Sequence, residues 1–591
     1  MPHFVNAVNL VLNIWIQFDG PHTLREMKQC RSSIKNLKLD PHATAAWNLA
    51  TMAPYIIDRQ LYVNDRPFLV RGGELQNSSM SSAAYMRPLW PKLKSYHLNT
   101  VLGAVTWDQV EPEEGKFDFS ELDQCIADAD ANGLKLILLW FGAFKNGMSS
   151  YTPSWVKTDA VRFPRVQIRS NETSRLKTIE VMSLFNHNLR DSDCRAFVEL
   201  MKHLKSVDQK HTVIMVQLEN EVGILGDSMD RSPAAVQEYE TAKIPERVVK
   251  LLTDPRNTLH SLRANLRGAN LAVGVTWKEA FSNTPRGEEL FMAYHYAVYV
   301  QHITSAAKET NNLPIYTNVW QNKSGPASAA SGGGAPGEYP SGGAVANVLD
   351  IWQSEAPLLD LVAPDIYLND YDERCQWYCQ SAQPLFIPEQ RRDEAGARRM
   401  WRAIGKYGAI GACPFGIDSM ESPYAKHWQL LSYVESIVLK AQPSPMTIVG
   451  FFFDEYDEKV AENGKLEEQS HTFEKYEVVI RRAHVYGKPG PGYGLIIQED
   501  LDQFLLVGAG FQAEFAAKNK KSDNIISGIL RVEEKQFVNG QLQTLRLLNG
   551  DETQSGKSIT MPNEDPDYAG FPVAITIPAN TKIARAFLYT I

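Results

Sequence analysis

The stretch Thr100–Trp140, TVLGAVTWDQVEPEEGKFDFSELDQCIADADANGLKLILLW, decides the fold. It begins with the apolar run TVLGAV, passes through a polar loop and an amphipathic segment, Phe119–Asn132, and ends in a second apolar run, Leu134–Trp140. Gly133 follows the amphipathic segment at the point where a helix commonly ends in a left-handed residue. Near-continuous apolar runs are typical of parallel strands covered on both faces, so the stretch predicts a strand, a helix and a second parallel strand.

The same alternation continues along the chain and predicts eight strands in roughly 360 residues. These are Phe68–Gly72, Thr100–Val105, Leu134–Trp140, Thr212–Gln217, Pro314–Val319, Leu359–Ile366, Pro384–Pro388 and Ala409–Cys413. Predicted helices between or after them include Phe119–Asn132, Ser192–Leu204, Glu288–Glu309, Glu394–Tyr407 and Ala425–Ala441. The fold class is therefore α/β, a (β/α)8 barrel. A doubly wound open sheet is the main alternative, but no Gly-rich phosphate turn follows the first predicted strand.

We predict three regions. Residues 1–45 form an N-terminal extension without a clear period, and residues 46–445 form the barrel. After the Pro-rich break at 443–446 the composition changes to short strand-like runs separated by Gly, Asn or Pro, so residues 446–591 are predicted to be an all-β, sandwich-like domain. Its expected strands are Gly450–Tyr456, Thr472–Arg481, Gly494–Gln498, Gln503–Phe515, Ile529–Val538, Leu542–Leu548 and Val573–Ile577.

Composition excludes several classes of protein. The 591 residues are 44% hydrophobic and 22% charged, as in a folded globular protein, and the net charge of −9 argues against nucleic-acid binding. No apolar run of 18 residues exists, so no membrane span is expected. The N-terminus lacks the basic region and cleavage site of a signal peptide, which slightly favours a cytoplasmic protein. Three glycosylation sequons, at Asn77, Asn171 and Asn322, would suit a secreted one, so localisation stays open.

Carboxylates gather after the predicted strands, at the barrel end where catalytic residues lie. The polar and aromatic residues at these positions are Glu74, Trp107, Glu111, Glu219, Asn220, Glu221, Asp365, Tyr367 and Glu389. Glu221 and Glu389 follow strands four and seven, on well-separated parts of one rim. Two carboxyl groups facing across a sugar, one protonated and one ionised, are what retaining glycoside hydrolysis requires.

The segment VIMVQLENEVG, Val213–Gly223, resembles the QxENExG signature of family 35 glycoside hydrolases, β-galactosidases with a (β/α)8 barrel. The resemblance implies that Glu221 is the acid/base and that Asn220 binds the sugar 2-hydroxyl. It extends over roughly residues 58–225, through LYVNDRPFLVRGGELQNSS, NTVLGAVTWDQVEPEEGKFDFS and WFGAFKNG…TPSWV. The sequence also departs from the family pattern. The residues before Glu111-Pro112, Asp108-Gln109-Val110, differ from the family pattern, and so does the context of Glu389, PEQRRD. These differences predict a divergent branch of the family with its own C-terminal domain.

Glu221 is thus predicted to be the acid/base and Glu389 the nucleophile, with Glu355 and Asp365 as the rival nucleophiles. Tyr367 is expected to donate to the nucleophile. The full set of predicted substrate-binding residues is Asn220, Glu111, Trp107, Trp140, Tyr367, Glu74, Asn77 and Glu219. No metal-ligand spacing is present, and no cofactor is expected.

The sequence therefore predicts a retaining exo-β-glycosidase acting on a carbohydrate, first of all a β-galactosidase. One alternative is another retaining glycosidase of the same clan, a β-mannosidase, β-xylosidase or α-arabinosidase, which would keep both glutamates. The alternative from a different class is a non-catalytic carbohydrate-binding protein, against which the two strand-end glutamates argue. Linkage preference and oligomeric state stay open.

Overall fold

The computed structural model describes residues 52–591 except 171–172, 174, 255–265, 267, 323–331, 380–382, 420, 455–466, 486–487, 519–525 and 564–578. Ala53–Ile591 forms one compact unit. The predicted extension, residues 1–45, and the predicted strand Val573–Ile577 lie outside the described residues. The domain boundaries at 45 and 445 remain predictions.

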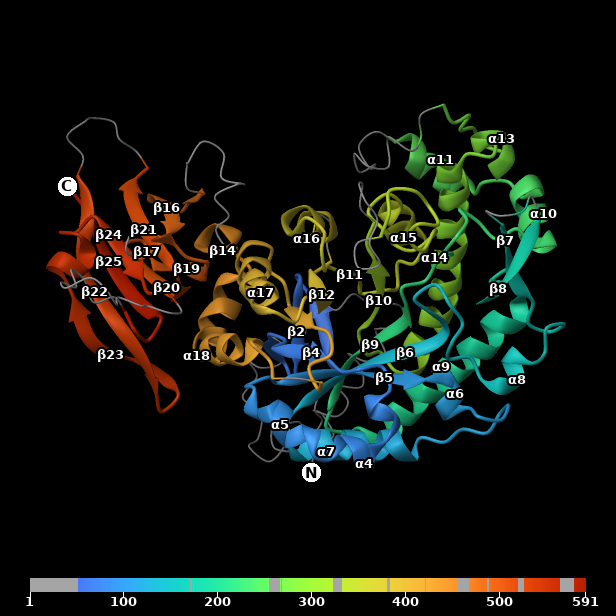
Figure 1. The fold of residues 1–591 in the computed structure, drawn as a ribbon, viewed down its shortest axis with the longest axis horizontal. Helices are drawn as coiled ribbons and strands as arrows, with labels where there is room; N and C mark the ends of the chain where they lie inside the picture. The colour runs from blue at the N-terminus through green and yellow to red at the C-terminus, as the bar shows by residue number, and fades with distance from the viewer. Residues whose placement is uncertain are drawn as a thin grey trace, which may run out of the picture. The chain divides into compact units, whose positions relative to one another are not determined.

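Eight parallel strands close into a barrel, as predicted (Figure 1). Bridges from Ile366 to Gln390, Val70 to Gly411 and Glu74 to Phe415 join the two parts of the sheet into a closed ring. In ring order the strands are β4 (Gly72–Glu74), β5 (Thr100–Thr106), β6 (Lys135–Lys145), β9 (Val213–Asn220), β10 (Ile315–Trp320), β11 (Leu361–Asp365), β12 (Phe386–Gln390) and β13 (Gly411–Pro414).

The first barrel strand lies further along the chain than predicted. Phe68 ends β3 (Arg66–Phe68), which forms a small antiparallel sheet with β1 (Tyr55–Ile57) and β2 (Gln60–Val63). Asn64 and Asp65, both at positive φ, form the two-residue turn that returns β3 onto β2. The first barrel strand therefore begins only at Gly72. Leu61 and Val63 of β2 join the apolar cluster that the inward-facing barrel residues form, so this sheet covers one end of the barrel interior.

Helices cover the outside of the barrel, and some of them begin at a side chain that caps the helix. The predicted helix Ser192–Leu204 is longer than expected because Asn186 caps it six residues earlier. Thr284 with Pro285 starts the longest helix in the same manner. The barrel helices are α4 (Ala83–Met86), α5 (Leu89–Ser95), α7 (Ser120–Ala131), α9 (His187–Val207), α14 (Pro285–Thr310), α15 (Leu349–Glu355), α16 (Tyr371–Tyr378), α17 (Glu394–Lys406) and α18 (Tyr424–Ala441).

Shorter elements extend the loops that follow the strands. They are α6 (Trp107–Val110), α8 (Ser154–Lys157), the hairpin β7 (Arg165–Arg169) and β8 (Leu176–Met182), and the helices α10 (Pro233–Thr241), α11 (Glu246–Thr253) and α13 (Trp277–Phe281). None of the helices within the described ranges is both long and apolar enough to cross a membrane.

Two antiparallel sheets follow the barrel, in agreement with the predicted all-β region. The first has the order β14 (Ile448–Phe453), β19 (Gly492–Asp500), β20 (Gln503–Ala509), β25 (Ile583–Thr590), β22 (Ser527–Val538), β23 (Gln541–Leu548). The second has the order β15 (Glu468–Thr472), β16 (Tyr476–Arg482), β21 (Phe511–Ala517), β24 (Ser558–Met561), and a short ribbon pairs β17 (His484–Val485) with β18 (Lys488–Pro489). The predicted run Gln503–Phe515 is two strands, since Gly510 at φ +72° turns the chain between them.

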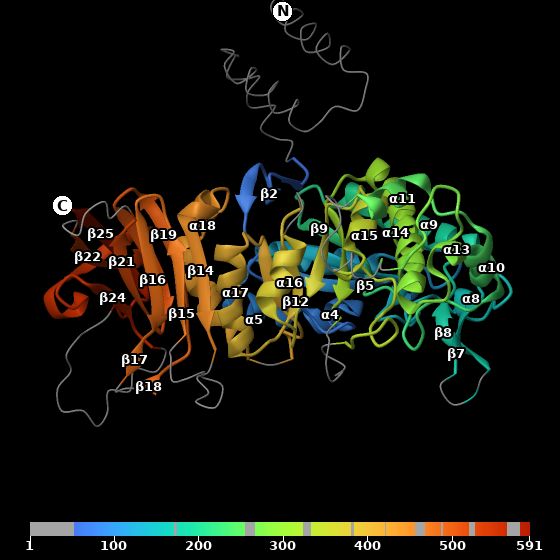
Figure 2. The same cartoon turned by 90° about the horizontal axis from the view of Figure 1, so that it is seen from above.

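The all-β region packs on the barrel through α17 and α18. Figure 2 shows both helices beside β14 and β19. One face of the six-stranded sheet packs against the second sheet, and Phe451 and Phe504 belong to the core between them. The other face contributes Tyr493 and Leu495 to the core of the barrel. Trp401 of α17 stacks on Tyr493 with ring centroids 5.4 Å apart. The two regions therefore share buried apolar surface.

Candidate active site

Glu221 and Glu389 lie close together at the mouth of the barrel. Glu221 follows β9 and Glu389 lies in β12, and the two residues are 7% and 6% exposed. Asp365, the last residue of β11, joins them. One carboxylate oxygen from each of the three residues lies within 4.8 Å of the others. Three strand ends thus bring three acids to one point.

Asn318 of β10 connects the three carboxyl groups. Its Nδ2 donates to Asp365 Oδ2 at 2.8 Å and to Glu389 Oε1 at 3.5 Å, while its Oδ1 accepts from the backbone N–H of Glu221 at 3.0 Å. The hydroxyl of Tyr367 donates to Glu389 Oε2 at 2.7 Å. Glu389 therefore accepts hydrogen bonds on both of its carboxyl oxygens.

The backbone at the end of β9 is in an uncommon conformation. Glu219 and Glu221 have φ values of +61° and +45°, in the left-handed region that residues other than glycine rarely adopt. Such positions concentrate at functional sites, where the surrounding structure stabilises them. The turn also means that Glu219 and Glu221 do not face the same way, as they would in a regular strand.

Glu219 is therefore placed differently from the prediction. Its carboxylate accepts from the backbone N–H groups of Ala143 and Phe144 at 3.1 and 2.7 Å, and it is hydrogen-bonded to Asp193 of α9. Asp193 also accepts from Trp140 Nε1 at 2.9 Å. Glu219 and Trp140 are both fully buried, so they belong to a polar network between strand and helix rather than to a sugar-binding surface.

Glu111 and Trp107 are likewise fully buried and contact each other. Glu111 accepts from Trp107 Nε1 and the N–H of Gly115, each at 2.7 Å, and from Arg195 at 3.1 Å. With its oxygens occupied and no exposed surface, Glu111 holds the loop after β5 in place. The prediction that these two residues contact the sugar does not fit this arrangement.

Other predicted residues have polar atoms without a hydrogen-bond partner in the part of the chain that the structure describes. Glu74 is 1% exposed and neither of its carboxyl oxygens has a hydrogen-bond partner. Asn220 accepts from Lys145 Nζ at 3.0 Å through Oδ1, but its Nδ2 has no partner. Asn77 Oδ1 also has none. Buried polar atoms are normally satisfied, so these three are candidates for contact with a ligand.

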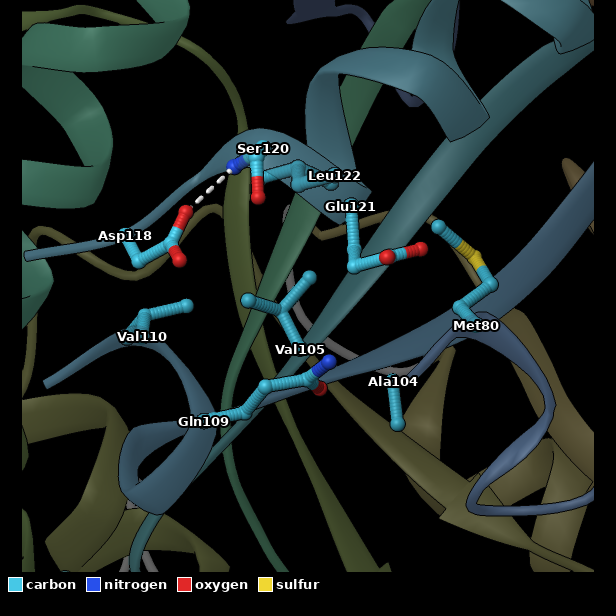
Figure 3. A pocket seen from close by; sticks show the side chains of 9 residues that line it. All are labelled: Met80, Ala104, Val105, Gln109, Val110, Asp118, Ser120, Glu121 and Leu122. Carbon is cyan, nitrogen blue, oxygen red and sulfur yellow. Dashed lines mark hydrogen bonds between the residues drawn. The ribbon is translucent and has the colours of Figure 1, made fainter. Parts of the chain in front are cut away.

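Asn77 lines an open cavity beside the barrel mouth. The cavity measures about 310 Å³ and is lined by Asn77, Ser78, Ser81, Ala104, Thr106, Asp108, Gln109 and Tyr151. A second cavity of about 100 Å³ shares Ala104 and Gln109 with it (Figure 3). The acids in this second cavity are engaged by protein, since Asp118 accepts from the N–H of Ser120 and Glu121 from that of Ala83. The first cavity is therefore the better candidate for a ligand.

Burial and mutual repulsion set the protonation of the acids. Burial first, and then the charge of Glu389, raises the pKa of Glu221 to about 7, against the opposing effect of Lys145. The pKa values of Glu74 and Asp365 are raised well above the ordinary range, again by burial first and by Glu389 second. At neutral pH the site therefore holds neutral and ionised carboxyl groups side by side.

A metal ion is the other ligand that this cluster could hold. Within the described ranges, the carboxyl oxygens of Glu221, Asp365 and Glu389 lie close enough together to bind one cation. Amide and phenol donors already occupy Asp365 Oδ2 and both oxygens of Glu389. Such donors compete with a metal for the same lone pairs, so the set suits hydrogen-bonded carboxyl groups better than metal ligands. The expectation of a metal-free site stays a prediction.

Sequence reasoning missed Asn318 and gave Lys145 no role. Asn318 was included in the apolar run Pro314–Val319. The signal was present, because a polar side chain near the end of a buried parallel strand faces the end of the barrel where catalytic groups gather.

Comparisons with known proteins find similarity over part of the chain. The family model of glycoside hydrolase family 42, described as β-galactosidase, matches residues 87–250. A second family model, described as a domain of unknown function, matches residues 424–560. The human β-galactosidase-1-like protein 3 is 28% identical over 212 residues, covering 35% of this chain and 29% of that protein. The human β-galactosidase-1-like protein 2 is 27% identical over 201 residues, covering 33% and 28%. The match thus spans less than a third of the length of these relatives.

Solved structures with similar folds include a β-galactosidase from Bacillus circulans sp. alkalophilus, 14% identical, with a TM-score of 0.42 over 63% of this chain and 57% of that one. The catalytic domain of a β-amylase from Paenibacillus polymyxa is 13% identical, with a TM-score of 0.43 over 63% and 98%. The family and sequence matches support a glycoside hydrolase of the β-galactosidase type. The family model that matches is family 42, and membership of family 35 is not confirmed.

Proposed function

We propose that the protein is a retaining exo-β-glycosidase that hydrolyses terminal β-D-galactosyl residues. The observation that carries the proposal is the approach of Glu221 and Glu389, whose carboxylate oxygens come within 4.8 Å. Retaining enzymes hold their two carboxyl groups about 5–5.5 Å apart, because the nucleophile attacks the sugar directly and no water is placed between them. A separation of about 9 Å would instead suit inversion.

The proposed first step uses the different protonation of the two acids. Glu389, ionised and held by Tyr367 and Asn318, attacks the anomeric carbon, while Glu221 gives its proton to the glycosidic oxygen. The aglycone leaves as an alcohol, and the sugar becomes an ester of Glu389. In the second step Glu221, now ionised, takes a proton from water as the water attacks the same carbon and releases Glu389.

The field of Glu389 explains how one residue serves both steps. Its negative charge contributes to the raised pKa of Glu221 in the free enzyme, which keeps the acid protonated near neutral pH. Formation of the ester removes that charge, so the pKa of Glu221 falls and the residue becomes the base. No cofactor takes part in these two steps.

We assign sugar recognition to the groups that have unused hydrogen-bonding capacity. Asn220 Nδ2 would donate to the 2-hydroxyl, as the resemblance implies, and Glu74 would accept from one or two other hydroxyl groups. Lys145, 8% exposed, orients Asn220 from the neighbouring strand. Glu111, Trp107, Trp140 and Glu219 are left out of this set, because all four are fully buried and hydrogen-bonded within the protein.

A panel of nitrophenyl glycosides tests the proposal. We expect the β-D-galactoside to be hydrolysed fastest, with the β-anomer of the free sugar appearing first by NMR. Fastest hydrolysis of a mannoside, xyloside or arabinoside would move the specificity to another enzyme of the clan. Sugar binding without hydrolysis of any substrate would mean a carbohydrate-binding protein. Glu355→Gln is the matched control, since Glu355 pairs with Arg247 at 2.6 Å outside the cluster.

A further inference from the structure

Asp365 lies beside both proposed catalytic acids but takes part in neither step of the proposed reaction. It ends β11, is 2% exposed, and has an oxygen within 4.8 Å of both Glu221 and Glu389. Its Oδ2 accepts from Asn318 Nδ2 at 2.8 Å, whereas its Oδ1 meets no N–H or hydroxyl donor. A buried carboxyl group with one neutral donor is poorly prepared to carry a charge.

The carboxyl groups of Asp365 and Glu221 have oxygens within 4.8 Å of each other, and a hydrogen bond between them lowers the pKa of Glu221 and raises that of Asp365. An ionised carboxylate only accepts hydrogen bonds, so two carboxyl groups can share one only when a proton lies between them. The pair therefore holds at least one proton in the arrangement seen here. The question is which of the two residues keeps it while Glu221 changes its protonation state.

The surroundings assign that proton to Asp365. Glu389 has two donors, one of them the phenol of Tyr367, and Lys145 lies near Glu221 and Glu74 and lowers their pKa values. Burial and then the charge of Glu389 raise the pKa of Asp365 well above its ordinary range, and no cation opposes them. The titratable groups that act on it, or on which it acts, from the surrounding elements are Glu74, Glu221, Tyr316, Tyr367, Tyr378 and Glu389.

We propose that Asp365 remains a neutral acid throughout the reaction and donates its hydrogen bond to Glu221, which makes it a positioning residue for the acid/base group. The inference rests on the function proposed above. When Glu221 gives its proton to the leaving oxygen, the Asp365 hydroxyl stabilises the carboxylate that forms and holds it toward the incoming water. The proton of Asp365 stays on Asp365, and the proton that moves is that of Glu221.

Infrared difference spectroscopy tests the protonation of Asp365 without any substrate. The spectrum of the wild-type protein minus that of Asp365→Asn is recorded at pH 6 and pH 8. We expect one carbonyl band of a protonated carboxylic acid at both pH values, with no loss of carboxylate bands. Loss of a carboxylate band at pH 8 would overturn the proposal. This readout does not depend on glycosidase activity, so it decides the matter even if the proposed function fails.

The kinetic test compares two replacements of Asp365. Asparagine can accept from Asn318 and donate an N–H to Glu221, so Asp365→Asn should keep kcat/KM within about threefold and leave the alkaline limb of its pH profile in place. Asp365→Leu removes the donor. Its alkaline limb should move up by about one pH unit and its kcat for a dinitrophenyl glycoside should fall about tenfold, because ionised Glu221 loses stabilisation.

A downward shift of the alkaline limb in Asp365→Asn by one unit or more would contradict the proposal, because it would mean that a charged Asp365 raises the pKa of Glu221. Thermal melting of both variants controls for folding. Rescue by asparagine relative to leucine, at equal melting temperature, separates the hydrogen bond from packing.

Discussion

The hydroxyl of Tyr367 donates a 2.7 Å hydrogen bond to Glu389 Oε2, across the gap between β11 and β12. Tyr367 lies two residues beyond Asp365, so one short segment serves two acids of the site. The contact was expected from the sequence, and it gives the proposed nucleophile a donor that Asn318 alone would not supply. A phenol is an effective donor to a carboxylate because it stabilises the charge while staying neutral.

Replacing Tyr367 by Phe should therefore impair the nucleophile. A hydrogen bond to a charged group contributes about 1.5–3 kcal/mol, so kcat/KM should fall by about 10- to 100-fold. The loss should appear for activated as well as unactivated leaving groups, because the nucleophile takes part in the attack whatever the leaving group is. Tyr239→Phe, which removes a hydrogen bond to Ser282 far along the chain, is the control. Unchanged kinetics in Tyr367→Phe would remove Tyr367 from the site.

Glu221→Gln and Glu389→Gln should fail in different ways. Glutamine at 221 cannot donate a proton, but a dinitrophenolate leaving group does not need one. The glycosyl-enzyme should therefore form and accumulate, because its hydrolysis lacks a base. Azide should restore turnover and give the β-glycosyl azide. Glutamine at 389 removes the nucleophile, so the activated substrate should remain almost untouched. Azide rescue of the 389 variant with retention would contradict the assignment, and Glu355 and Asp365 would then be tested as nucleophiles.

The raised pKa of Glu221 also predicts how stability changes with pH. Between 4.5, the ordinary value, and about 7, the folded protein binds more protons at this site than the unfolded chain, so the group's contribution to stability falls as pH rises through this window. Glu221→Gln should thus match wild type near pH 4.5 and exceed it at pH 8 by about 1–3 kcal/mol, or about 1–3 °C in melting temperature. Calorimetry at the two pH values measures this. Glu477→Gln, exposed on β16, should show no such crossover.

Glu111 provides a test of structural against binding roles. Glu111→Gln weakens a buried network with Trp107, Gly115 and Arg195, so it should lower the free energy of unfolding by about 1–3 kcal/mol and leave KM for a nitrophenyl glycoside unchanged. Glu74→Gln should do the reverse and raise KM with little loss of stability, since the carboxyl oxygens of Glu74 have no hydrogen-bond partner among the described residues. A raised KM with normal melting in Glu111→Gln would return that residue to the sugar site.

The barrel could be predicted because the pattern that specifies it is local and repeated. Each strand is a short apolar run, and each is followed by a longer amphipathic segment, so the order of elements follows from the sequence alone. The first strand was misplaced because Phe68 is apolar in either setting. Only the pairing of β3 with β2, which depends on the turn at Asn64 and Asp65, divides the run Phe68–Gly72.

The sequence identified which strand ends carry acids, but it did not distinguish sugar-facing side chains from buried ones. Trp107 and Glu111 follow a strand just as Glu74 does, yet a helical turn, α6, directs them toward each other. Glu219 would face the same way as Glu221 in a regular strand, and the positive φ values at both residues change that relation. Backbone strain of this kind leaves no composition signal. Asn318 was missed because its signal was a single polar residue near the end of an apolar run, without a motif around it.

The barrel and the all-β region meet where α17 packs against β14. Gly405 of α17 and Gly450 of β14 touch through their backbones, and a Cβ atom on Gly405 would lie 2.5 Å from the N and Cα atoms of Gly450. Gly405→Ala must therefore separate helix from strand, because backbone atoms cannot move aside as a flexible side chain can. We expect a loss of about 1–3 kcal/mol in stability. The interface also includes Trp401 and Tyr493, which should separate as well.

Limited proteolysis of Gly405→Ala should then cut near Pro443–Pro445 and release fragments that the wild-type protein does not yield, since this connector is short and the intact interface holds the two regions together. Gly490→Ala is the matched control, because its added Cβ would meet only the side chain of Asn563, at 3.3 Å. If the wild-type protein releases a stable C-terminal fragment just as readily, the all-β region is a tethered domain rather than a packed one. Equal melting temperatures for Gly405→Ala and wild type would likewise show that the close contact contributes nothing to stability.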